Sequence, residues 1–441
     1  MVSDFTSVAN VSRPLVVHFL GEEPPINLSF WDGSNIESPL SKATLKINTP
    51  NAFRRLLYAP AELGLARAYI TSEIDIQGDI FDALNIRQQL EEIGKQSLKL
   101  KAPERLKLIK SIAKLGAFGP PLKPPPEEMR PGLIHRAHTK ENDSASISHH
   151  YDVSNDFYAL FLGKSMTYSC AFFQTPELTL DEAQNFKYEL ISNKLGLTNG
   201  MKLLDIGCGW GGMLIYACQN FGVGGVGITL SKEQAAFANK KIRLLGLEDK
   251  IKVRIQDYRD ISGETFDAIS SIGMFEHVGL DNLKLYFTKV RSMLKDSGRF
   301  LNHGISRPFR KLGFHRNGFN RNSFINRYVF PDGELIELGA VVSAMQESGF
   351  EVRDVESLRE HYALTLKHWV RNLESQFGKA VDIVGENRAR TWRLYMAASQ
   401  LNFEENRTSI HQILGVSTPK SGASGMPLNR LAMFNKKLFE Q

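Results

Sequence analysis

Cysteine is scarce in this chain of 441 residues, which contains three, Cys170, Cys208 and Cys218. They form no C-x-x-C pair and no Cys/His spacing of a structural zinc site. We therefore predict neither a disulfide framework nor a metal centre, and a reducing compartment such as the cytoplasm fits this cysteine usage.

Long apolar runs are also missing. Nothing in the sequence approaches the ~18 uninterrupted apolar residues of a membrane-spanning helix. The apolar run at residues 15–20 is short, contains His18 and lacks the basic flank of a signal peptide. We therefore do not expect a transporter, a channel or a secreted mini-protein.

The chain lacks a strong excess of either positive or negative charge. Lys and Arg number 54 against 48 Asp and Glu, a net charge of +6, and hydrophobic residues make up 42%. This composition is typical of a globular enzyme, and the length predicts two or three domains. The mild basic excess permits an anionic partner, such as a phospholipid surface, without requiring one.

A proline-rich run at residues 119–126 divides the chain, because consecutive prolines exclude both helix and central strand. Ahead of it we expect a mixed domain with strands at 15–19 and 43–47 and a helix over 51–69 that Pro60 divides. The expected division is an N-terminal domain at 1–119, a linker at 120–148 lying over the second domain, a second domain at 149–415 and a tail at 416–441.

Two segments of the chain combine basic residues with apolar ones. Residues 104–115 have the pattern of an amphipathic helix, with Leu108, Ile109, Ile112 and Leu115 as its apolar members. This helix is either a solvated charged face over the core of its domain or a helix that rests on anionic lipid headgroups. Residues 307–321 combine five Arg or Lys with three Phe and no acid, a composition that suits phospholipid headgroups or nucleic acid.

After residue 200, short strand patterns alternate with helix patterns. The predicted helices cover 213–221 and 232–247. The predicted strands cover 202–206, 224–229, 252–256 and 266–270. Regular β-α-β alternation predicts a parallel, doubly wound sheet whose ligands bind at the carboxyl ends of its strands.

The most informative local pattern is the run LLDIGCGWGG at residues 203–212. A strand, a glycine-rich turn and a helix follow one another here, which is also the arrangement of dinucleotide enzymes. Asp205 lies just ahead of the first glycine, where its carboxylate suits a cationic ligand. The next strand ends at Thr229 without the terminal acid that is usual in NAD sites. We therefore interpret the loop as a site for S-adenosylmethionine (SAM) rather than a nicotinamide cofactor.

Further motifs, in the same order, are similar to those of the cyclopropane fatty acid synthase family, including its mycolic acid and tuberculostearic acid methyltransferase branches. The matching runs are 150–158 (HYDVSNDFY), 166–170 (MTYSC), 227–234 (GITLSKEQ), 256–260 (QDYRD), 271–279 (SIGMFEHVG), 328–333 (YVFPDG) and 361–369 (HYALTLKHW). The resemblance implies a Rossmann-like SAM-dependent methyltransferase sheet of the α/β class, with a smaller mixed N-terminal domain that helps to present lipid.

The resemblance also implies a set of residues around SAM. They are Tyr168, Ser169, Asp205, Gly207, Gly209, Gly211, Thr229, Gln234, Asp257, Tyr258 and Arg259. Physical reasoning agrees for several of them. Gln234 can hydrogen-bond a ribose through both ends of its amide, and Asp257 can accept from an adenine amino group while the ring of Tyr258 packs on the adenine face. A helix cap or loop contact is the ordinary alternative for each residue alone.

In similar synthases the catalytic base is a bound bicarbonate ion. The family pattern places its ligands at Cys170, Glu276, His303, Tyr362 and, through the backbone, Ile305. An ordinary structural interpretation exists for each of them: Glu276 at the start of a helix, and the others in the core. Many relatives have a cysteine where this chain has Ser399. Direct attack of an alkene on SAM needs no covalent protein intermediate, so activity is still expected.

The expected function is therefore SAM-dependent methylation of the cis double bond of an unsaturated phospholipid acyl chain, through a carbocation. The product is a cyclopropane ring or a methylene branch destined to become a methyl branch. The alternatives are a methyltransferase for RNA or a small molecule and a non-catalytic lipid-binding relative. We expect a peripheral protein on the inner face of the cell membrane, at an anionic surface, with no nucleic-acid partner. A homodimer, and a reductase that completes a methyl branch, remain open.

Overall fold

The computed structural model describes residues 7–39, 41–59, 62–86, 102–129, 154–309, 323–330 and 334–434. The chain forms two compact units, which we describe separately. The first comprises Met1–Arg130, Asn322–Tyr328 and Val384–Leu401, and the second comprises Pro131–Arg321, Val329–Ile383 and Asn402–Gln441. Two segments from the later part of the chain thus belong to the first unit, whereas the sequence predicts one contiguous second domain.

The first unit contains a small mixed sheet with helices. Its elements are α1 (Val8–Leu20), β1 (Asn27–Phe30), β2 (Asn35–Ile36), β3 (Thr44–Ile47), α2 (Asn51–Tyr58), α3 (Glu62–Ile70), β4 (Ile74–Gln77), α4 (Ile80–Leu84), α6 (Ala102–Lys114), α13 (Phe324–Tyr328) and most of α17 (Glu386–Glu404). The strand order is β2-β1-β3-β4, with β1 and β3 parallel. The predicted strand at 43–47 and the helix divided near Pro60 are both confirmed.

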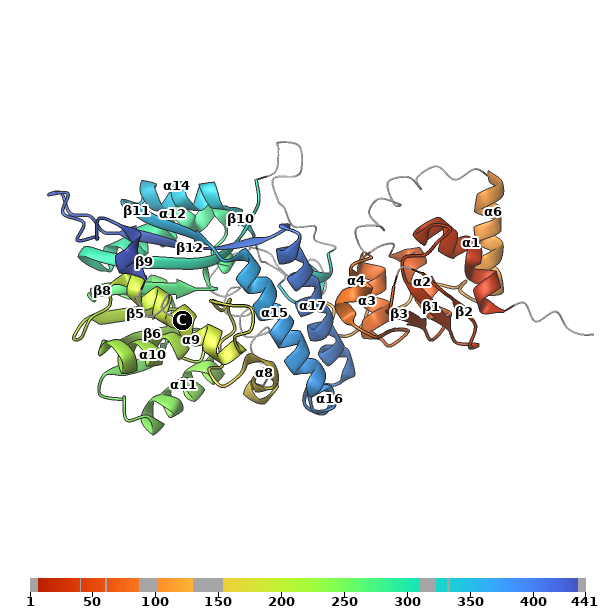
Figure 1. Ribbon diagram of the computed structural model, residues 1–441, viewed down its shortest axis with the longest axis horizontal. Helices are drawn as coiled ribbons and strands as arrows, with labels where there is room; N and C mark the ends of the chain where they lie inside the picture. Colours follow the sequence, from red (N-terminus) through yellow and green to blue (C-terminus); the bar gives the residue numbers. More distant parts are fainter. Residues whose placement is uncertain are drawn as a thin grey trace, which may run out of the picture. The chain divides into compact units, whose positions relative to one another are not determined.

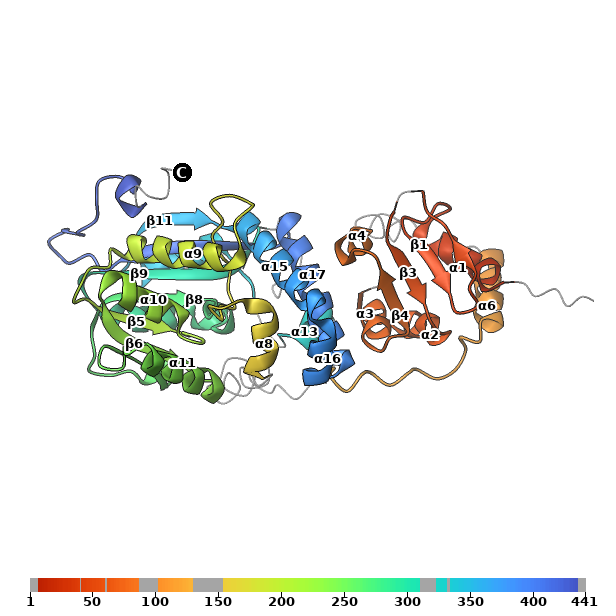
Figure 2. The ribbon, with the colours of Figure 1, turned by 60° about the horizontal axis from the view of Figure 1, so that its bottom comes forward.

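The predicted strand at residues 15–19 is wrong, because these residues lie in helix α1. The Ser7 side chain accepts from the N–H of Asn10 and caps the helix. The buried residues Ala9, Ser12 and Val16 recur at helical spacing, a period that the short run 15–19 does not reveal. Helix α6 lies beside α1 (Figure 2).

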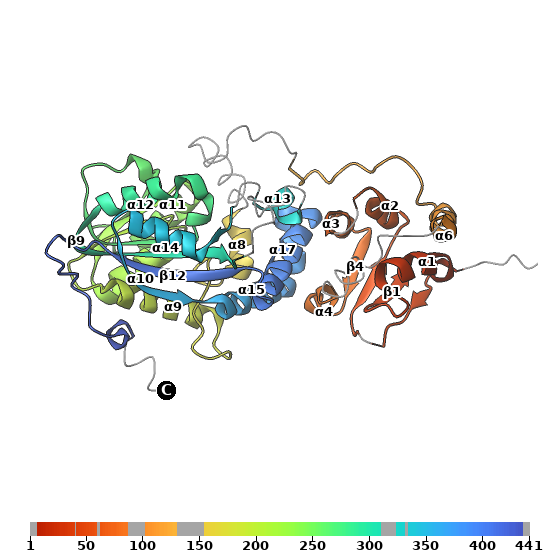
Figure 3. The same cartoon turned by 90° about the horizontal axis from the view of Figure 1, so that it is seen from above.

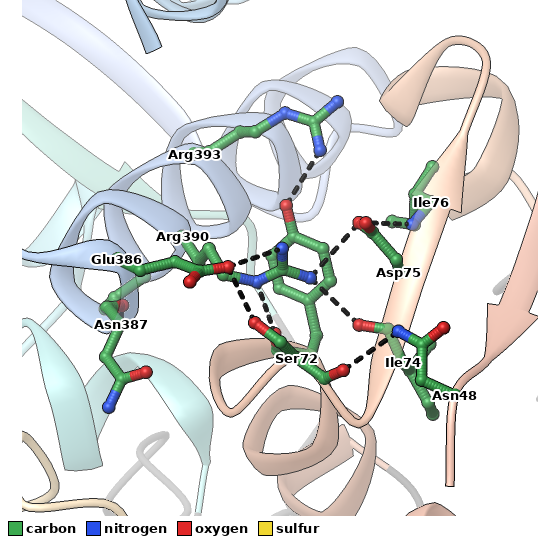
Figure 4. A network of polar contacts seen from close by, with 11 residues as sticks. Asn48, Ser72, Ile74, Asp75, Ile76, Glu386, Asn387, Arg390 and Arg393 are labelled. Atoms are coloured by element: carbon green, nitrogen blue, oxygen red, sulfur yellow. Dashed lines mark hydrogen bonds and ion pairs between the residues drawn. The ribbon is translucent and has the colours of Figure 1, made fainter. Parts of the chain in front are cut away.

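Helix α17 is held in the first unit by a network of polar contacts around Arg390 (Figure 4). Its guanidinium donates to the backbone carbonyls of Tyr69 at 2.6 Å and Ile74 at 2.9 Å, and it lies 4.2 Å from the centroid of the Tyr69 ring. Arg393 donates to the Tyr69 hydroxyl at 2.7 Å. Because Arg390 and Tyr69 are 321 positions apart in the chain, no local pattern could have predicted this contact.

The proline-rich segment has no helix or strand between residues 119 and 129, as predicted. Its contacts lie in the first unit. Arg55 donates to the carbonyl of Lys123 at 3.0 Å, and Arg67 forms a bidentate pair with Glu128. These contacts connect residues 120–129 to the first unit, the expected linker lying over the second domain stays a prediction, and residues 130–148 lie outside the described residues.

The second unit is built on one large sheet. Its strands are β5 (Lys202–Ile206), β6 (Gly224–Thr229), β7 (Ile251–Ile255), β8 (Phe266–Ile272), β9 (Leu294–Arg307), β10 (Ile336–Glu337), β11 (Glu351–Ser357) and β12 (Ser409–Val416). They are ordered β11-β12-β9-β8-β5-β6-β7, and β10 pairs with β9. The pairs β9–β8, β8–β5, β5–β6 and β6–β7 are parallel, so the predicted α/β sheet is confirmed.

Helices cover both faces of this sheet. The helices of the second unit are α8 (Asn155–Leu162), α9 (Leu180–Leu195), α10 (Gly212–Phe221), α11 (Lys232–Leu244), α12 (Leu283–Ser292), α14 (Leu338–Glu347), α15 (Arg359–Ser375) and α16 (Phe377–Val384). One core joins α9, α10 and α11 to the sheet, and a second core joins α12 and α14 (Figures 1 and 3). Four one-turn 3₁₀ helices complete the described structure: η1 (Tyr258–Asp260), η2 (Phe275–His277), η3 (Leu280–Asn282) and η4 (Arg430–Met433).

The strand order reverses at β5, because the chain runs outward through β6 and β7 and returns to β8 on the other side of β5. Such a reversal leaves a crevice at the carboxyl ends of the strands, where ligands of doubly wound folds bind. Among the described helices, none is long and apolar enough to cross a membrane.

Candidate active site

A glycine turn follows β5 at this reversal. Gly207, Gly209 and Gly211 have φ values of 72°, 53° and 81°, which side chains other than glycine adopt at a cost. Gly207 is also crowded, since a Cβ there would lie 2.8 Å from the Cβ of Met274. Helix α10 begins directly after the turn, so its backbone N–H groups point at the crevice.

A cavity of about 140 Å³ lies against this turn. Ten of the eleven residues predicted to surround SAM line it: Tyr168, Ser169, Asp205, Gly207, Gly209, Thr229, Gln234, Asp257, Tyr258 and Arg259. Gly211 is the exception. A Cβ on Gly211 would meet the Cβ of Ala238 at 3.2 Å, so this glycine allows α10 and α11 to pack closely.

Polar side chains at the strand ends are already engaged with one another. The Thr229 hydroxyl donates to Gln234 Oε1 at 2.7 Å. The amide nitrogen of Gln234 is therefore the end that remains to bind a ligand, whereas both ends were expected to do so. Asp257 accepts from the backbone N–H of Arg259 at 2.8 Å and from its guanidinium at 2.6 Å. The carboxylate of Asp257 therefore orients Arg259, in addition to facing the cavity as predicted.

Asp205 and Lys187 are buried ionisable groups in the cavity wall. Burial raises the pKa of Asp205 to about 7, although the Ser270 hydroxyl donates to this carboxylate at 2.7 Å. Burial lowers the pKa of Lys187 to about 7. The sequence reasoning missed Lys187. The signal was its position on the apolar side of α9, at helical spacing from Leu180, Ala183 and Ile191.

An aromatic cluster joins the cavity to α15. The Tyr168 ring stacks on Trp369, with centroids 5.1 Å apart and an interplanar angle of 25°. Trp369 in turn meets Tyr362 edge to face at 6.0 Å, because these two residues are seven positions apart on one side of α15. Rings of this kind present negative faces that can stabilise a cation.

Glu276 and Ile305, two of the predicted bicarbonate ligands, are in direct contact. Glu276 lies in η2, and its Oε1 accepts from the backbone N–H of Ile305 at 2.6 Å. Its Oε2 is buried and has no hydrogen-bond partner among the residues that the structure describes, and burial raises the pKa of this carboxyl to about 7. Because Ile305 donates its N–H to Glu276, the backbone of Ile305 orients that carboxylate.

This contact depends on Gly304, which lies between His303 and Ile305 on β9. A Cβ at Gly304 would be 2.3 Å from the ring of Phe275, so glycine is the residue that lets η2 approach β9. His303 is fully buried, and burial lowers its pKa well below the ordinary value. Gln412 Nε2 lies 3.3 Å from His303 Nδ1, while His303 Nε2 has no partner within the described parts of the chain. With the amide as donor, the neutral ring carries its proton on Nε2.

Cys170 and Tyr362 meet at the backbone of Leu358. The Cys170 thiol lies 3.7 Å from the Leu358 carbonyl, which also accepts the N–H of Tyr362 at 3.1 Å. Burial raises the pKa of Cys170, so this cysteine is a neutral thiol rather than a nucleophilic thiolate. The predicted basic segment 307–321 and the motifs at 150–158 and 328–333 lie partly outside the described residues.

The family model of mycolic acid cyclopropane synthetase matches residues 138–413 of this chain. A probable fatty acid methyltransferase of Mycobacterium tuberculosis is 40% identical over 415 residues, which are 92% of this chain and 94% of the relative. A probable fatty acid methyltransferase of Pseudomonas putida is 38% identical over 412 residues, 93% of this chain and 96% of the relative.

Two solved structures are similar to more than half of this chain. The cyclopropane synthase MmaA2 from Mycobacterium tuberculosis superimposes with a TM-score of 0.59 at 33% identity, over 63% of this chain and 99% of that one. The mycolic acid cyclopropane synthase CmaA1, complexed with SAH and CTAB, gives a TM-score of 0.58 at 33% identity, over 62% and 98%.

Proposed function

The chain belongs to the mycolic acid cyclopropane synthetase family and is a SAM-dependent methyltransferase that acts on lipids; from this premise we propose that its substrate is the cis double bond of an unsaturated acyl chain in membrane phospholipid. A carbon–carbon double bond is a weak nucleophile. A site for it must hold the reacting atoms in line and away from water, and must provide a base for the proton that leaves.

The observation that carries this proposal is that two buried atoms, Glu276 Oε2 and His303 Nε2, have no hydrogen-bond partner among the described residues, and that both residues adjoin residues of the cavity wall. Glu276 lies between the cavity-lining residues Met274 and His277. His303 is the register partner of Ile272, which also lines the cavity. One atom is an acceptor and the other a donor, the complement of a small anion that carries one hydroxyl and free oxygens.

SAM, when bound, supplies an electrophilic methyl group, and bicarbonate, when bound, supplies the base. The glycine turn and Asp205 would hold SAM, while Glu276 would accept the hydroxyl of bicarbonate and His303 would donate to one of its oxygens. Tyr168, Trp369 and the aromatic residues packed on them would stabilise a positive charge on the acyl chain and keep water away from it.

The experiment that tests this function is gas chromatography with mass spectrometry of phospholipid acyl chains after incubation with labelled SAM. We expect label in the acyl chains of unsaturated liposomes and none in RNA. A ring product identifies a cyclopropane synthase, and a methylene branch identifies an enzyme whose product a reductase completes. Label in neither lipid product would contradict the proposal.

An enzyme that acts on membrane lipid must bind a membrane surface, and α6 in the first unit is suited to this binding. Ile112 and Leu115 are buried against Leu15 of α1, but Leu106 and Ile109 are 54% and 50% exposed. One side of this helix therefore packs on the core of its domain, as the first interpretation expects, while a second apolar stripe faces solvent, which supports the proposal of lipid binding.

Basic residues flank that stripe. Lys107, Lys110 and Lys114 are all exposed, and on a helical wheel they lie together at one border of the exposed apolar residues. Apolar side chains beside lysines on one surface fit the headgroup and upper acyl region of an anionic leaflet. We propose peripheral binding to the inner face of the cell membrane through this side of α6.

Replacing Lys107, Lys110 and Lys114 by Glu should lower affinity for anionic phospholipid vesicles by at least about a hundredfold in sedimentation. Each basic residue near an anionic leaflet contributes about 1 kcal/mol. Wild-type binding should also weaken as salt increases. The matched control reverses Lys240, Arg243 and Lys250, three exposed cations of the second unit. Equal losses in both triple variants, or binding that ignores salt, would contradict a specific role for α6.

A further inference from the structure

Helix α9 carries two fully buried lysines, Lys187 and Lys194, whose surroundings differ. Lys194 is paired with two carboxylates, Asp354 at 3.1 Å and Glu356. No carboxylate oxygen of the described chain lies within 4.0 Å of Lys187 Nζ. It donates a hydrogen bond to Ser169 Oγ at 3.0 Å, and the Tyr188 ring centroid lies 4.4 Å away.

A buried ammonium without a carboxylate partner is costly, so its persistence needs a reason. Lys194 has the carboxylate partners that a buried ammonium usually needs. They belong to β11, so the ion pairs also connect α9 to the sheet. Lys187 lines the cofactor cavity instead. Burial disfavours the charged forms of both Lys187 and Asp205, and their mutual attraction offsets this only in part, so the pKa of each is brought to about 7. A ligand with one negative and one positive group would relieve both.

Helix α9 also holds Ser169 at two points. Gln184 Nε2 donates to the Ser169 carbonyl at 2.9 Å, and Lys187 donates to the Ser169 hydroxyl oxygen from the next turn. Because Lys187 occupies an acceptor site of that oxygen, the hydroxyl proton of Ser169 remains to be donated. Both residues line the cavity, but Ser169 is 8% exposed and Lys187 is fully buried, so the Ser169 hydroxyl is the more accessible of the two groups.

We propose that Lys187, acting through Ser169, forms a carboxylate-binding subsite for the methionyl end of SAM, opposite in charge to Asp205, which takes its ammonium group. Lys187 is thus a positioning residue: it orients the Ser169 hydroxyl and supplies the positive charge behind it. The inference rests on the proposed function, because it assumes that SAM occupies this cavity.

The test is calorimetry with two ligands that share the adenosine and the sulfur. S-adenosylhomocysteine has the amino-acid end, and 5′-methylthioadenosine lacks it. Lys187→Met should weaken S-adenosylhomocysteine binding at least about tenfold, since a charge-assisted hydrogen bond is lost, and leave 5′-methylthioadenosine within about twofold of wild type. Ser192→Ala, a buried change on α9 outside the cavity wall, should leave both affinities unchanged.

Ser169→Ala provides a second route that keeps Lys187 in place. It should cause the same selective loss, and the double variant should lose no more than the larger single loss, because both residues act on one contact. Additive losses, equal losses for both ligands, or a wild-type affinity in Lys187→Met would overturn the subsite while leaving the cofactor assignment intact. A wild-type protein that binds neither ligand would overturn the subsite and the proposed function together.

Discussion

Glu276→Gln should lower kcat at least about a hundredfold on unsaturated phospholipid vesicles while S-adenosylhomocysteine affinity stays within about twofold of wild type. The amide can still accept the N–H of Ile305, now donated at 2.6 Å to Oε1. The unpartnered Oε2, however, becomes an NH₂ group that cannot accept the hydroxyl of an anion. Loss of a positioned acid–base group typically costs 10²–10⁴ in rate, about the size expected here.

The rate should also depend on bicarbonate. We expect wild-type kcat, measured as methyl incorporation from labelled SAM, to fall in bicarbonate-depleted buffer and to recover on its addition. An unchanged rate there would remove the anion from the mechanism.

The matched control for Glu276→Gln is Glu334→Gln, which should keep the wild-type kcat. This partly exposed glutamate accepts a backbone N–H from Leu280 at 2.9 Å and lies outside the cavity wall.

Glu276→Gln should be at least as stable as wild type at alkaline pH. Burial raises the pKa of Glu276 from 4.5 to about 7. A raised folded-state pKa contributes stability that is present below pH 4.5 and lost as pH rises through 7, a loss of about 3 kcal/mol. The amide does not ionise, so thermal unfolding should favour Glu276→Gln increasingly between pH 5 and pH 8. A variant that unfolds more easily at pH 8 would mean that its low kcat reflects misfolding.

Gly207→Val should reduce S-adenosylhomocysteine affinity by at least about a hundredfold in calorimetry. Valine at a φ of 72° is strained, and its Cβ would lie 2.8 Å from the Cβ of Met274, in the wall of the cavity. The branched side chain would therefore displace the turn or Met274, and a loss of about 3 kcal/mol corresponds to this factor.

The control for backbone strain alone is Gly246→Val. Gly246 has a φ of 66°, and a Cβ there would meet nothing within 4 Å, so this variant carries the strain without crowding the cavity. It should lose a similar amount of thermal stability and keep wild-type affinity. If both valine variants bind S-adenosylhomocysteine normally, the glycine turn does not form the cofactor site.

The cofactor end of the fold was predictable because its determinants are local in the chain. Strand β5 and the glycines after it combine an apolar run with backbone angles that glycine adopts freely. Ten of the residues predicted around SAM therefore line one cavity, since parallel strands bring their carboxyl ends to the same edge. The resemblance to a family, rather than spacing, brought Glu276 and His303 into the predicted set.

Errors and omissions arose where long-range packing decides. Residues 15–19 look like a short strand alone, but Ala9 and Val16 bury one side of a helix. The membership of α17 in the first unit depends on Arg390 and Tyr69, which the chain separates widely. Lys187 looks like an ordinary charged residue of a helix until its surroundings are known.

By itself, the sequence determined the α/β class, the glycine turn at the carboxyl end of β5 and the absence of a long apolar run, because each depends on neighbouring residues. Only the tertiary structure decided which buried charges have partners. It pairs Lys194 with acids of β11, gives Lys187 a hydroxyl instead of an acid, and leaves Glu276 Oε2 and His303 Nε2 without a hydrogen-bond partner in the described part of the chain. The cost of burying a charge or a polar atom depends on what surrounds it in space, and that is not written in any short stretch of the chain.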